Sequence, residues 1–265
     1  MLDRKYSNII TNAIAQKPRE TRNAETRSYF GEHLIVSNLE KGLFPLLLGR
    51  QLYYKGVFGE LAAFLKGPKS VKDFRDQGCN YWDEWADKTG KLTVDYGNAW
   101  LDFNGVNQLK ELVKNLKENP TGRRHIINAW RPDHLTKLSL PCCHYAYQWY
   151  VTNEGFLDMI WVQRSVDVMI GLPSDIILAA VWNILLAQTV KLKPGKLHFM
   201  LGDTHVYESH MDNVMEYLDQ MQNAHLMPHP TWELAKSATV FNFKPEMLVI
   251  KNYHPMPPIK FKIEV

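Results

Sequence analysis

The chain has 265 residues, of which 45% are hydrophobic and 22% are charged, a composition typical of a soluble globular protein with an ample core. Its net charge of +3 is too small to argue for a nucleic acid or an acidic membrane surface as partner. Three cysteines do not form an even disulfide set, and the N-terminus lacks an apolar run of signal-peptide type, so we expect a cytoplasmic protein with reduced thiols.

Hydrophobic periodicity and turn residues predict the elements in chain order. We expect a helix over residues 1–15, a strand pair over 26–39, a helix over 54–66 that Gly67-Pro68 stops, and an amphipathic helix over 104–119. Strands follow at 124–130, 146–151 and 156–163, then a buried helix at 174–192, a strand at 197–201, and a strand pair from residue 241 onward with a proline-broken hinge at 254–258. Strands and helices are interspersed without a regular βαβ rhythm, which predicts one α+β domain over residues 1–265.

Two residues, Ser174 and Asp175, stand where the long helix is predicted to begin. Both side chains are good helix N-caps, and that is the local interpretation. The alternative is that Asp175 reads the edge of a ligand base. The most apolar stretch, residues 176–187, contains Asn183 and is too short to cross a bilayer.

The segment LPCCHYAYQWYV places Cys142 and Cys143 beside His144. A zinc site is one interpretation of this cluster. However, adjacent cysteines do not easily bind the same tetrahedral ion, and no second Cys/His cluster completes four ligands, so we expect no metal. A buried inert thiol is the commonest fate of a cysteine. A nucleophile would need nearby cations to lower its pKa, and spacing alone does not place the arginines around it.

Glu60 lies within the apolar helical segment GVFGELAAFLKG. A carboxylate in such a segment either faces solvent or acts as a tuned acid or base, and the segment by itself favours solvent. The pair Arg123-Arg124 suits a phosphate, although a solvated turn is the commoner role.

Eight segments in register resemble the thymidylate synthase family over nearly the whole chain. They are FPLLLGRQLYYKGVFGELAAFLKG, YWDEWAD, DYGNAW, GRRHIINAWRP, LPCCHYAYQWYV, QRSVDVMIGLP, LGDTHVY and NYHPMPPIKFKIEV. The resemblance implies a thymidylate synthase-like fold, in which a mixed sheet packs with helices, and a homodimer formed through the sheets with two shared active sites. It implies no partnership with nucleic acid or membrane, and host cytoplasm as the location if the source is a virus.

The resemblance also assigns roles to individual residues. Cys143 matches the nucleophile, because the family motif places histidine directly after it (His144) and glutamine five residues on (Gln148), whereas Cys142 stands where the family usually has proline. Glu60, Tyr96 and Asp167 would organise the water and proton network. The nucleotide would be held by Arg22, Arg164, Ser165, Gln163, Asp175, His205 and Tyr207, and by Arg123 and Arg124 of the other subunit. The folate pocket would be lined by Trp82, Trp85, Leu140 and Gly171, and closed by Val265.

The implied chemistry suits these residue types. C5 of a pyrimidine becomes nucleophilic once a thiolate has added at C6. The co-substrate, 5,10-methylenetetrahydrofolate, brings the one-carbon unit, so no metal is needed. A glutamate that moves protons at the base benefits from a raised pKa. The loop RNAETRS departs from the family's usual phosphate loop. If the alignment is shifted here, Arg27 rather than Arg22 would bind the phosphate.

Asp175 replaces the asparagine that the family normally has there. An asparagine amide matches O4 and N3–H of uracil, whereas an ionised aspartate only accepts hydrogen bonds. A protonated aspartate, or one facing a protonated N3, matches cytosine, so the residue favours dCMP over dUMP and resembles the family's dCMP hydroxymethylase branch.

The product depends on whether hydride or water quenches the exocyclic methylene. Several residues on the folate side are smaller than in the family: Ser174 replaces phenylalanine, Ala62-Ala63 replaces Leu-Trp, and Leu48-Gly49 replaces Thr-Thr. Smaller groups could admit water, which slightly favours hydroxymethyl-dCMP as the product. Trp82 and the tail ending in Val265 are retained, however, and these make methylation of dCMP nearly as well supported. The rivals are a thymidylate synthase or hydroxymethylase acting on dUMP and, in another class, a catalytically inactive nucleotide-binding relative. Retention of Cys143, Glu60, Arg164, Asp167, His205 and Tyr207 argues against the last.

Overall fold

The computed structural model describes residues 2–224 and 226–264. Its centre is a six-stranded sheet in the order β1-β2-β6-β5-β4-β3, in which only β5 and β6 run parallel among the paired strands. The strands are β1 (Arg19–Glu20), β2 (Glu25–Val36), β3 (Ile126–Asn128), β4 (His144–Val151), β5 (Phe156–Asp167) and β6 (Lys193–Tyr207). The mixed sheet packed against helices confirms the predicted α+β class.

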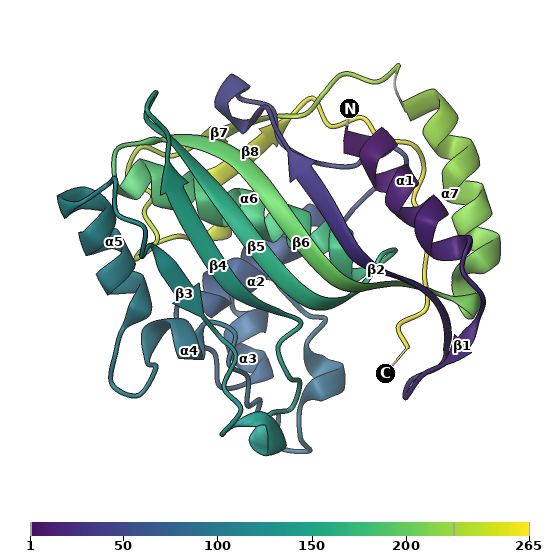
Figure 1. Cartoon of the computed structure of the whole chain (residues 1–265), viewed down its shortest axis with the longest axis horizontal. Coiled ribbons are helices and arrows are strands. Elements are labelled where there is room, and N and C mark those ends of the chain that lie inside the picture. Colours follow the sequence, from purple (N-terminus) through teal and green to yellow (C-terminus); the bar gives the residue numbers. More distant parts are fainter. Residues whose placement is uncertain (1, 225, 265) are drawn as a thin grey trace.

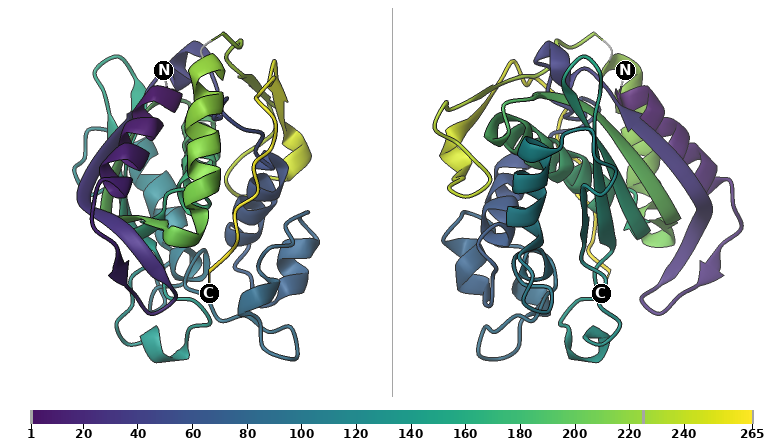
Figure 2. Two further views of the ribbon diagram at one scale, coloured as in Figure 1. Left: turned by 90° about the vertical axis from the view of Figure 1, so that its right-hand side faces the viewer. Right: turned by 60° about the vertical axis from the view of Figure 1, so that its left-hand side comes forward.

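The helices cover one face of this sheet and one of its edges. Figure 1 shows α2 and α6 behind the sheet, and α1 and α7 beyond its β2 edge, while the face turned to the viewer carries no helix. The helices are α1 (Leu2–Ile14), α2 (Tyr54–Phe64), α3 (Val71–Arg75), α4 (Asn98–Leu101), α5 (Gln108–Glu118), α6 (Gly171–Thr189) and α7 (Met211–Ala224). The turned views show the extended C-terminal segment, in yellow, passing α7 (Figure 2).

Helix α6 is the centre of the core because it is apolar on all sides. It is long and apolar enough to cross a bilayer by composition, yet 78% of its most apolar window is buried inside the protein. Its polar residue Asn183 donates to the Leu157 carbonyl oxygen at 2.9 Å, which ties the helix to β5.

The start of α6 differs from the prediction. The helix begins at Gly171, and its N-cap, Ile170, makes no side-chain capping bond. Ser174 lies in the first turn, where its hydroxyl donates to the Ile170 carbonyl oxygen at 3.2 Å. The N-cap interpretation of Ser174 and Asp175 is therefore wrong, because both lie inside the helix.

Three other predicted elements change in extent. The strand pair expected over 26–39 is the single strand β2, and the strand at 197–201 is the middle of the much longer β6. From residue 241 onward there is one strand, β8 (Leu248–Lys251), and its partner β7 (Thr231–Leu234) comes earlier in the chain. Helix α7 and the short helices α3 and α4 were not predicted.

Candidate active site

The predicted site residues gather where β4 begins and where β5 and β6 end. Cys143 directly precedes β4, and its carbonyl oxygen accepts the backbone N–H of Arg164 from β5 at 2.9 Å. Asp167 closes β5 opposite His205 of β6. The sheet thus brings together segments that are about sixty residues apart in the chain.

Cys143 is partly exposed, and two of the predicted partners surround it. The backbone N–H of Cys143 donates to the Tyr96 hydroxyl, and a guanidinium nitrogen of Arg164 lies 3.9 Å from the Cys143 sulfur. Burial raises the pKa of the Cys143 thiol, while the positive charge of Arg164 opposes that rise. Arg164 is fixed for this task because its Nε donates to the Cys142 carbonyl oxygen at 2.8 Å.

Cys142 occupies a different environment from its neighbour. It is buried, its sulfur lies 3.9 Å from the Ala129 carbonyl oxygen, and burial raises its pKa. A thiol in that position is inert. Among the described residues, no group of three or more histidine, cysteine or acidic side chains is placed to hold a metal ion.

Glu60 is buried in α2, so the expectation of a solvent-facing carboxylate, drawn from the segment alone, is wrong. Its two oxygens accept from the Tyr81 hydroxyl and the Trp82 indole N–H, each at 2.8 Å. Burial raises the pKa of Glu60 to about 7, although both hydrogen bonds work in the opposite direction. A carboxyl with this pKa is suited to take up and give off protons near neutral pH.

Asp175, the fifth residue of α6, faces β5, and 13% of its side chain is exposed. Gln163 donates from Nε2 to one carboxyl oxygen of Asp175 at 2.7 Å. Burial raises the pKa of Asp175 to about 8, a shift that the Gln163 hydrogen bond opposes and the charge of Glu60 reinforces. The carboxyl is therefore largely protonated at neutral pH.

His144 adjoins Asp175 on the other side, with Nε2 3.8 Å from its second oxygen. Its Nδ1 lies 2.6 Å from the Tyr147 hydroxyl, and its ring centre lies 4.4 Å from that of Tyr96. Burial lowers the pKa of His144 well below its usual value, so this imidazole is neutral.

The other nucleotide-side residues lie at the ends of β5 and β6. Asp167 accepts the backbone N–H groups of Met169 and Ile170 at 2.7 and 3.2 Å, and burial raises its pKa. His205 pairs with Asp203 through Nδ1 at 3.0 Å, and its ring lies edge-on to that of Tyr207. Ser165 is partly exposed between Arg164 and Val166.

The arginines expected at the phosphate are placed differently from one another. Arg22 is exposed in the turn between β1 and β2, and Arg123 and Arg124 are exposed in the segment before β3. Arg27, the alternative to Arg22, is engaged within the protein, where it pairs with Glu208 and donates to the Ile14 carbonyl oxygen. Arg27 is thus a structural residue in this conformation.

The residues expected to line the folate pocket are mainly apolar, as a flat heterocycle requires. Trp82 is buried and its ring centre lies 5.5 Å from that of Trp85, while Leu140 and Gly171 are partly exposed. Val265 lies outside the described residues. Its neighbour Glu264 accepts a hydrogen bond from the Ser209 hydroxyl at 2.8 Å, which places residue 264 beside the turn that follows β6.

Sequence reasoning missed four residues of this region. Tyr81 holds Glu60, Trp161 contacts Gln163, Tyr147 contacts His144, and Arg50 ties the tail to the turn after β5. The available signal was alternation along β4 and β5, which places Tyr147, Trp161 and Gln163 on the buried face.

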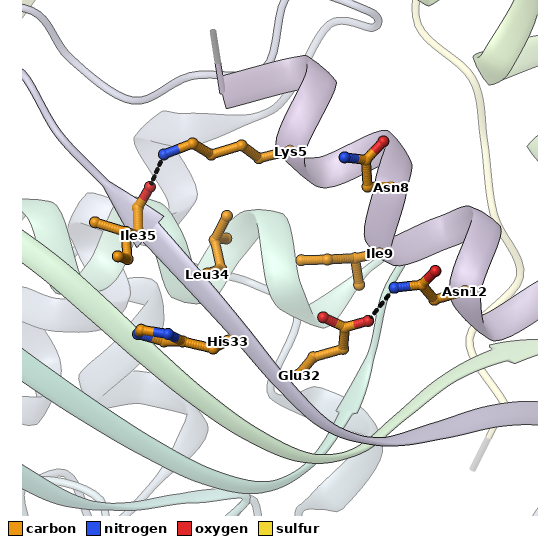
Figure 3. A pocket seen from close by; sticks show the side chains of 8 residues that line it. All are labelled: Lys5, Asn8, Ile9, Asn12, Glu32, His33, Leu34 and Ile35. Atoms are coloured by element: carbon orange, nitrogen blue, oxygen red, sulfur yellow. Dashed lines mark hydrogen bonds between the residues drawn. The ribbon is translucent and has the colours of Figure 1, made fainter.

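A surface pocket lies elsewhere, between α1 and β2 (Figure 3), and none of the predicted site residues lines it. Two of its polar side chains are already bonded within the protein. Lys5 donates to the Ile35 carbonyl oxygen at 2.7 Å, and Asn12 donates to Glu32 at 2.5 Å. This pocket gives no indication of a ligand.

Comparisons with known proteins agree with the geometry. The sequence model of the thymidylate synthase family matches residues 4–265. A protein described as a probable thymidylate synthase of Escherichia phage T5 is 34% identical over 282 residues, an alignment that covers 97% of this chain and 98% of that protein. The chain therefore belongs to the thymidylate synthase family, whose members transfer a folate-borne one-carbon unit to C5 of a pyrimidine nucleotide.

Proposed function

We propose that this enzyme acts on dCMP and forms 5-hydroxymethyl-dCMP from methylenetetrahydrofolate and water. The observation that supports the choice of base is Asp175, a largely buried carboxyl whose pKa burial raises to about 8, in the position to which the resemblance assigns reading of the base. A neutral carboxyl offers one donor and one acceptor, and cytosine presents an acceptor at N3 and a donor at its 4-amino group. A mismatched base would leave a buried polar group unpaired, at a cost of about 1–3 kcal/mol.

Within this proposal, the residues have distinct tasks. The Cys143 sulfur adds to C6 of the base, and Arg164 both favours the thiolate and binds the nucleotide phosphate with Ser165. Glu60 moves protons at the base, together with Tyr96 and Asp167 through ordered water. His205 and Tyr207 bind the deoxyribose hydroxyl. The folate supplies the one-carbon unit against Trp82, Trp85, Leu140 and Gly171.

Ser174 carries the argument for water rather than hydride. It is partly exposed beside Asp175, and its hydroxyl is already bonded to the Ile170 carbonyl oxygen. A small side chain there leaves room that the family's phenylalanine would fill. The other small residues, Ala62 and Ala63, are fully packed in the core and open no such room.

A homodimer through the sheets is part of the proposal. The helix-free face of the sheet exposes Ile126 (48%), Tyr150 (58%), Ile160 (37%) and Met200 (45%), one from each of β3, β4, β5 and β6. Exposed apolar side chains gathered on one face of a sheet favour association through that face. The exposed Arg123 and Arg124 would then reach the partner's phosphate site.

The second candidate is thymidylate synthase itself, with dUMP as substrate. The name of the phage T5 relative favours it. A hydroxymethylase acting on dUMP belongs to the same class. In both, Asp175 would have to place its proton towards O4 of uracil.

One assay separates these functions. Purified protein is given methylenetetrahydrofolate with dCMP and dUMP in parallel, and the products are identified by mass. Conversion of dCMP supports the cytosine assignment, and the added mass distinguishes a methyl group from a hydroxymethyl group. Conversion of dUMP alone refutes it. The Cys143→Ala variant is the negative control for catalysis. If that variant kept the full biological function of the protein, the result would instead support a nucleotide-binding protein without catalytic activity.

A further inference from the structure

An aspartate by itself does not choose between cytosine and uracil. A neutral carboxyl matches cytosine when the oxygen nearest N3 carries the proton, and it matches uracil when the other oxygen does. Exchange of the proton between the two oxygens of Asp175 would therefore erase the selectivity that the residue is proposed to give. Something must fix which oxygen is the acceptor.

The contacts of Gln163 determine which oxygen of Asp175 is the acceptor. The indole N–H of Trp161 donates to Gln163 Oε1 at 3.1 Å, and an indole nitrogen donates only. On the other side, Gln163 Nε2 lies 3.2 Å from the Ser165 carbonyl oxygen, which only accepts. Both contacts demand the same orientation of the amide, so Nε2 must be the group that meets Asp175 Oδ2 at 2.7 Å.

It follows that Asp175 Oδ2 is always an acceptor. A proton on Oδ2 would face the amide hydrogens of Gln163, and flipping the amide to relieve this would break the bonds to Trp161 and Ser165. The proton therefore resides on Oδ1, the oxygen that lies 3.8 Å from His144 Nε2. The burial of Gln163 (3% exposed) and Trp161 (0%) keeps water from substituting for either contact.

We propose that Trp161 is a specificity-determining positioning residue, which orients Gln163 so that Asp175 presents one fixed acceptor and one fixed donor to the base. This rests on the proposed action on dCMP: Oδ2 would accept from the 4-amino group and Oδ1 would donate to N3. Trp161 itself touches neither substrate nor the reacting atoms.

The test is a double-mutant cycle between Trp161→Phe and Asp175→Ala, with kcat/KM measured for dCMP and for dUMP. Phenylalanine keeps an aromatic ring and removes the N–H, so only the Ser165 carbonyl oxygen is left to orient the Gln163 amide. We expect Trp161→Phe to lower the ratio of dCMP to dUMP turnover at least tenfold in the wild-type background. In the Asp175→Ala background, where Gln163 has no polar side chain to orient, the same change should leave the ratio within twofold.

The matched control is Trp149→Phe. Trp149 is about as buried on the neighbouring strand β4, but its indole N–H has no hydrogen-bond partner among the residues that the structure describes. This variant should lose stability as Trp161→Phe does and keep the wild-type ratio. An equal fall in the ratio for both variants, or no fall for Trp161→Phe, would overturn the proposal.

Failure of the proposed function is seen separately in the wild-type protein. If the wild type converts only dUMP, the assignment of dCMP fails and the proposal falls with it, whatever Trp161→Phe does. If the wild type prefers dCMP and Trp161→Phe keeps that preference, only the orienting role of Trp161 is refuted. Should Trp161→Phe fail to fold, Gln163→Leu removes the same constraint and is expected to lower the same ratio, and an unchanged ratio refutes the proposal.

Discussion

Glu60 and Asp175 are two buried carboxyl groups whose pKa values are raised by the same cause, removal from water. A raised pKa means that the folded state binds more protons than the unfolded chain, so stability falls as pH rises through the interval between the two values. For Asp175 this interval runs from the ordinary aspartate pKa of 3.8 to a pKa of about 8.

The first prediction concerns Asp175→Asn and stability. The variant cannot ionise at this position, so its unfolding free energy should gain on that of the wild type as pH rises from about 4 to about 8, by a few kcal/mol in total. Urea denaturation at pH 4.5, 6 and 8 measures the difference. Asp133→Asn is the control, because that carboxyl is exposed and has a lowered pKa. A pH-independent difference for Asp175→Asn would contradict the burial argument.

The second prediction concerns the proton chemistry of Glu60. The Tyr81 hydroxyl lowers the pKa of Glu60 by bonding to its carboxylate, so Tyr81→Phe should raise that pKa above about 7. We expect the limb of the kcat profile that reports Glu60 to move to higher pH while turnover persists. Glu60→Gln should abolish the limb and reduce kcat by about 10²–10⁴-fold. A profile that Tyr81→Phe leaves in place would assign the limb to another group.

At the scale of elements, the sequence predicted the long periodic helices and strands, but not the residues at which they begin and end. The helix of residues 54–66 and the strands β4 and β5 follow from local pattern. The start of α6 does not, because Ile170 is a poor capping residue and tertiary packing overrides the stronger signal of Ser174. The burial of Glu60 likewise could not be predicted from its own segment, because its partners Tyr81 and Trp82 come from another segment.

The C-terminal tail and the turn after β5 are joined by Arg50. This buried guanidinium donates to the carbonyl oxygens of Met169 and Ile259 and lies 4.7 Å from the centre of the Phe261 ring. It therefore couples the segment expected to close over the folate with the turn that leads to Gly171.

The third prediction is that Arg50→Met loosens this coupling. Methionine replaces the apolar stem but leaves the two carbonyl oxygens unpaired, which costs about 1–3 kcal/mol for each buried group. We expect faster tryptic cleavage in the tail and a KM for folate that rises at least fivefold, with a smaller rise in the KM for the nucleotide. Lys251→Met is the control, because its ion pair with Glu233 is exposed. Equal rises in both KM values would indicate general loosening instead.

At the scale of the whole molecule, the site exists only because the sheet brings distant segments together. The family resemblance supplied the residue roles, and periodicity alone did not. Contacts such as Trp161 with Gln163 depend on strand register, which the sequence pattern does not fix. The proposed association of two chains cannot be derived from local sequence pattern either, although the exposed face over β3, β4, β5 and β6 follows from alternation in strands that pack on one side.

The fourth prediction tests whether two chains share each site. In the proposed dimer, Arg123 and Arg124 of one subunit serve the site that contains the partner's Cys143. The variant Cys143→Ala and the double variant Arg123→Ala with Arg124→Ala should each have little activity alone. When the two variants are mixed in equal amounts after reversible dissociation, half of the dimers that re-form are hybrids. Each hybrid has one intact site and one inactive site, so about a quarter of wild-type activity should return.

The control for mixing is Ile160→Asp, which places a charge at the centre of the exposed face of β5. Introduced into both inactive variants, it should give monomers by sedimentation and no recovery on mixing, because a desolvated unpaired charge opposes association. If the two arginines instead bound the phosphate of their own subunit, no hybrid would contain an intact site. Mixing would then restore nothing even among dimers, and the shared-site arrangement would be wrong.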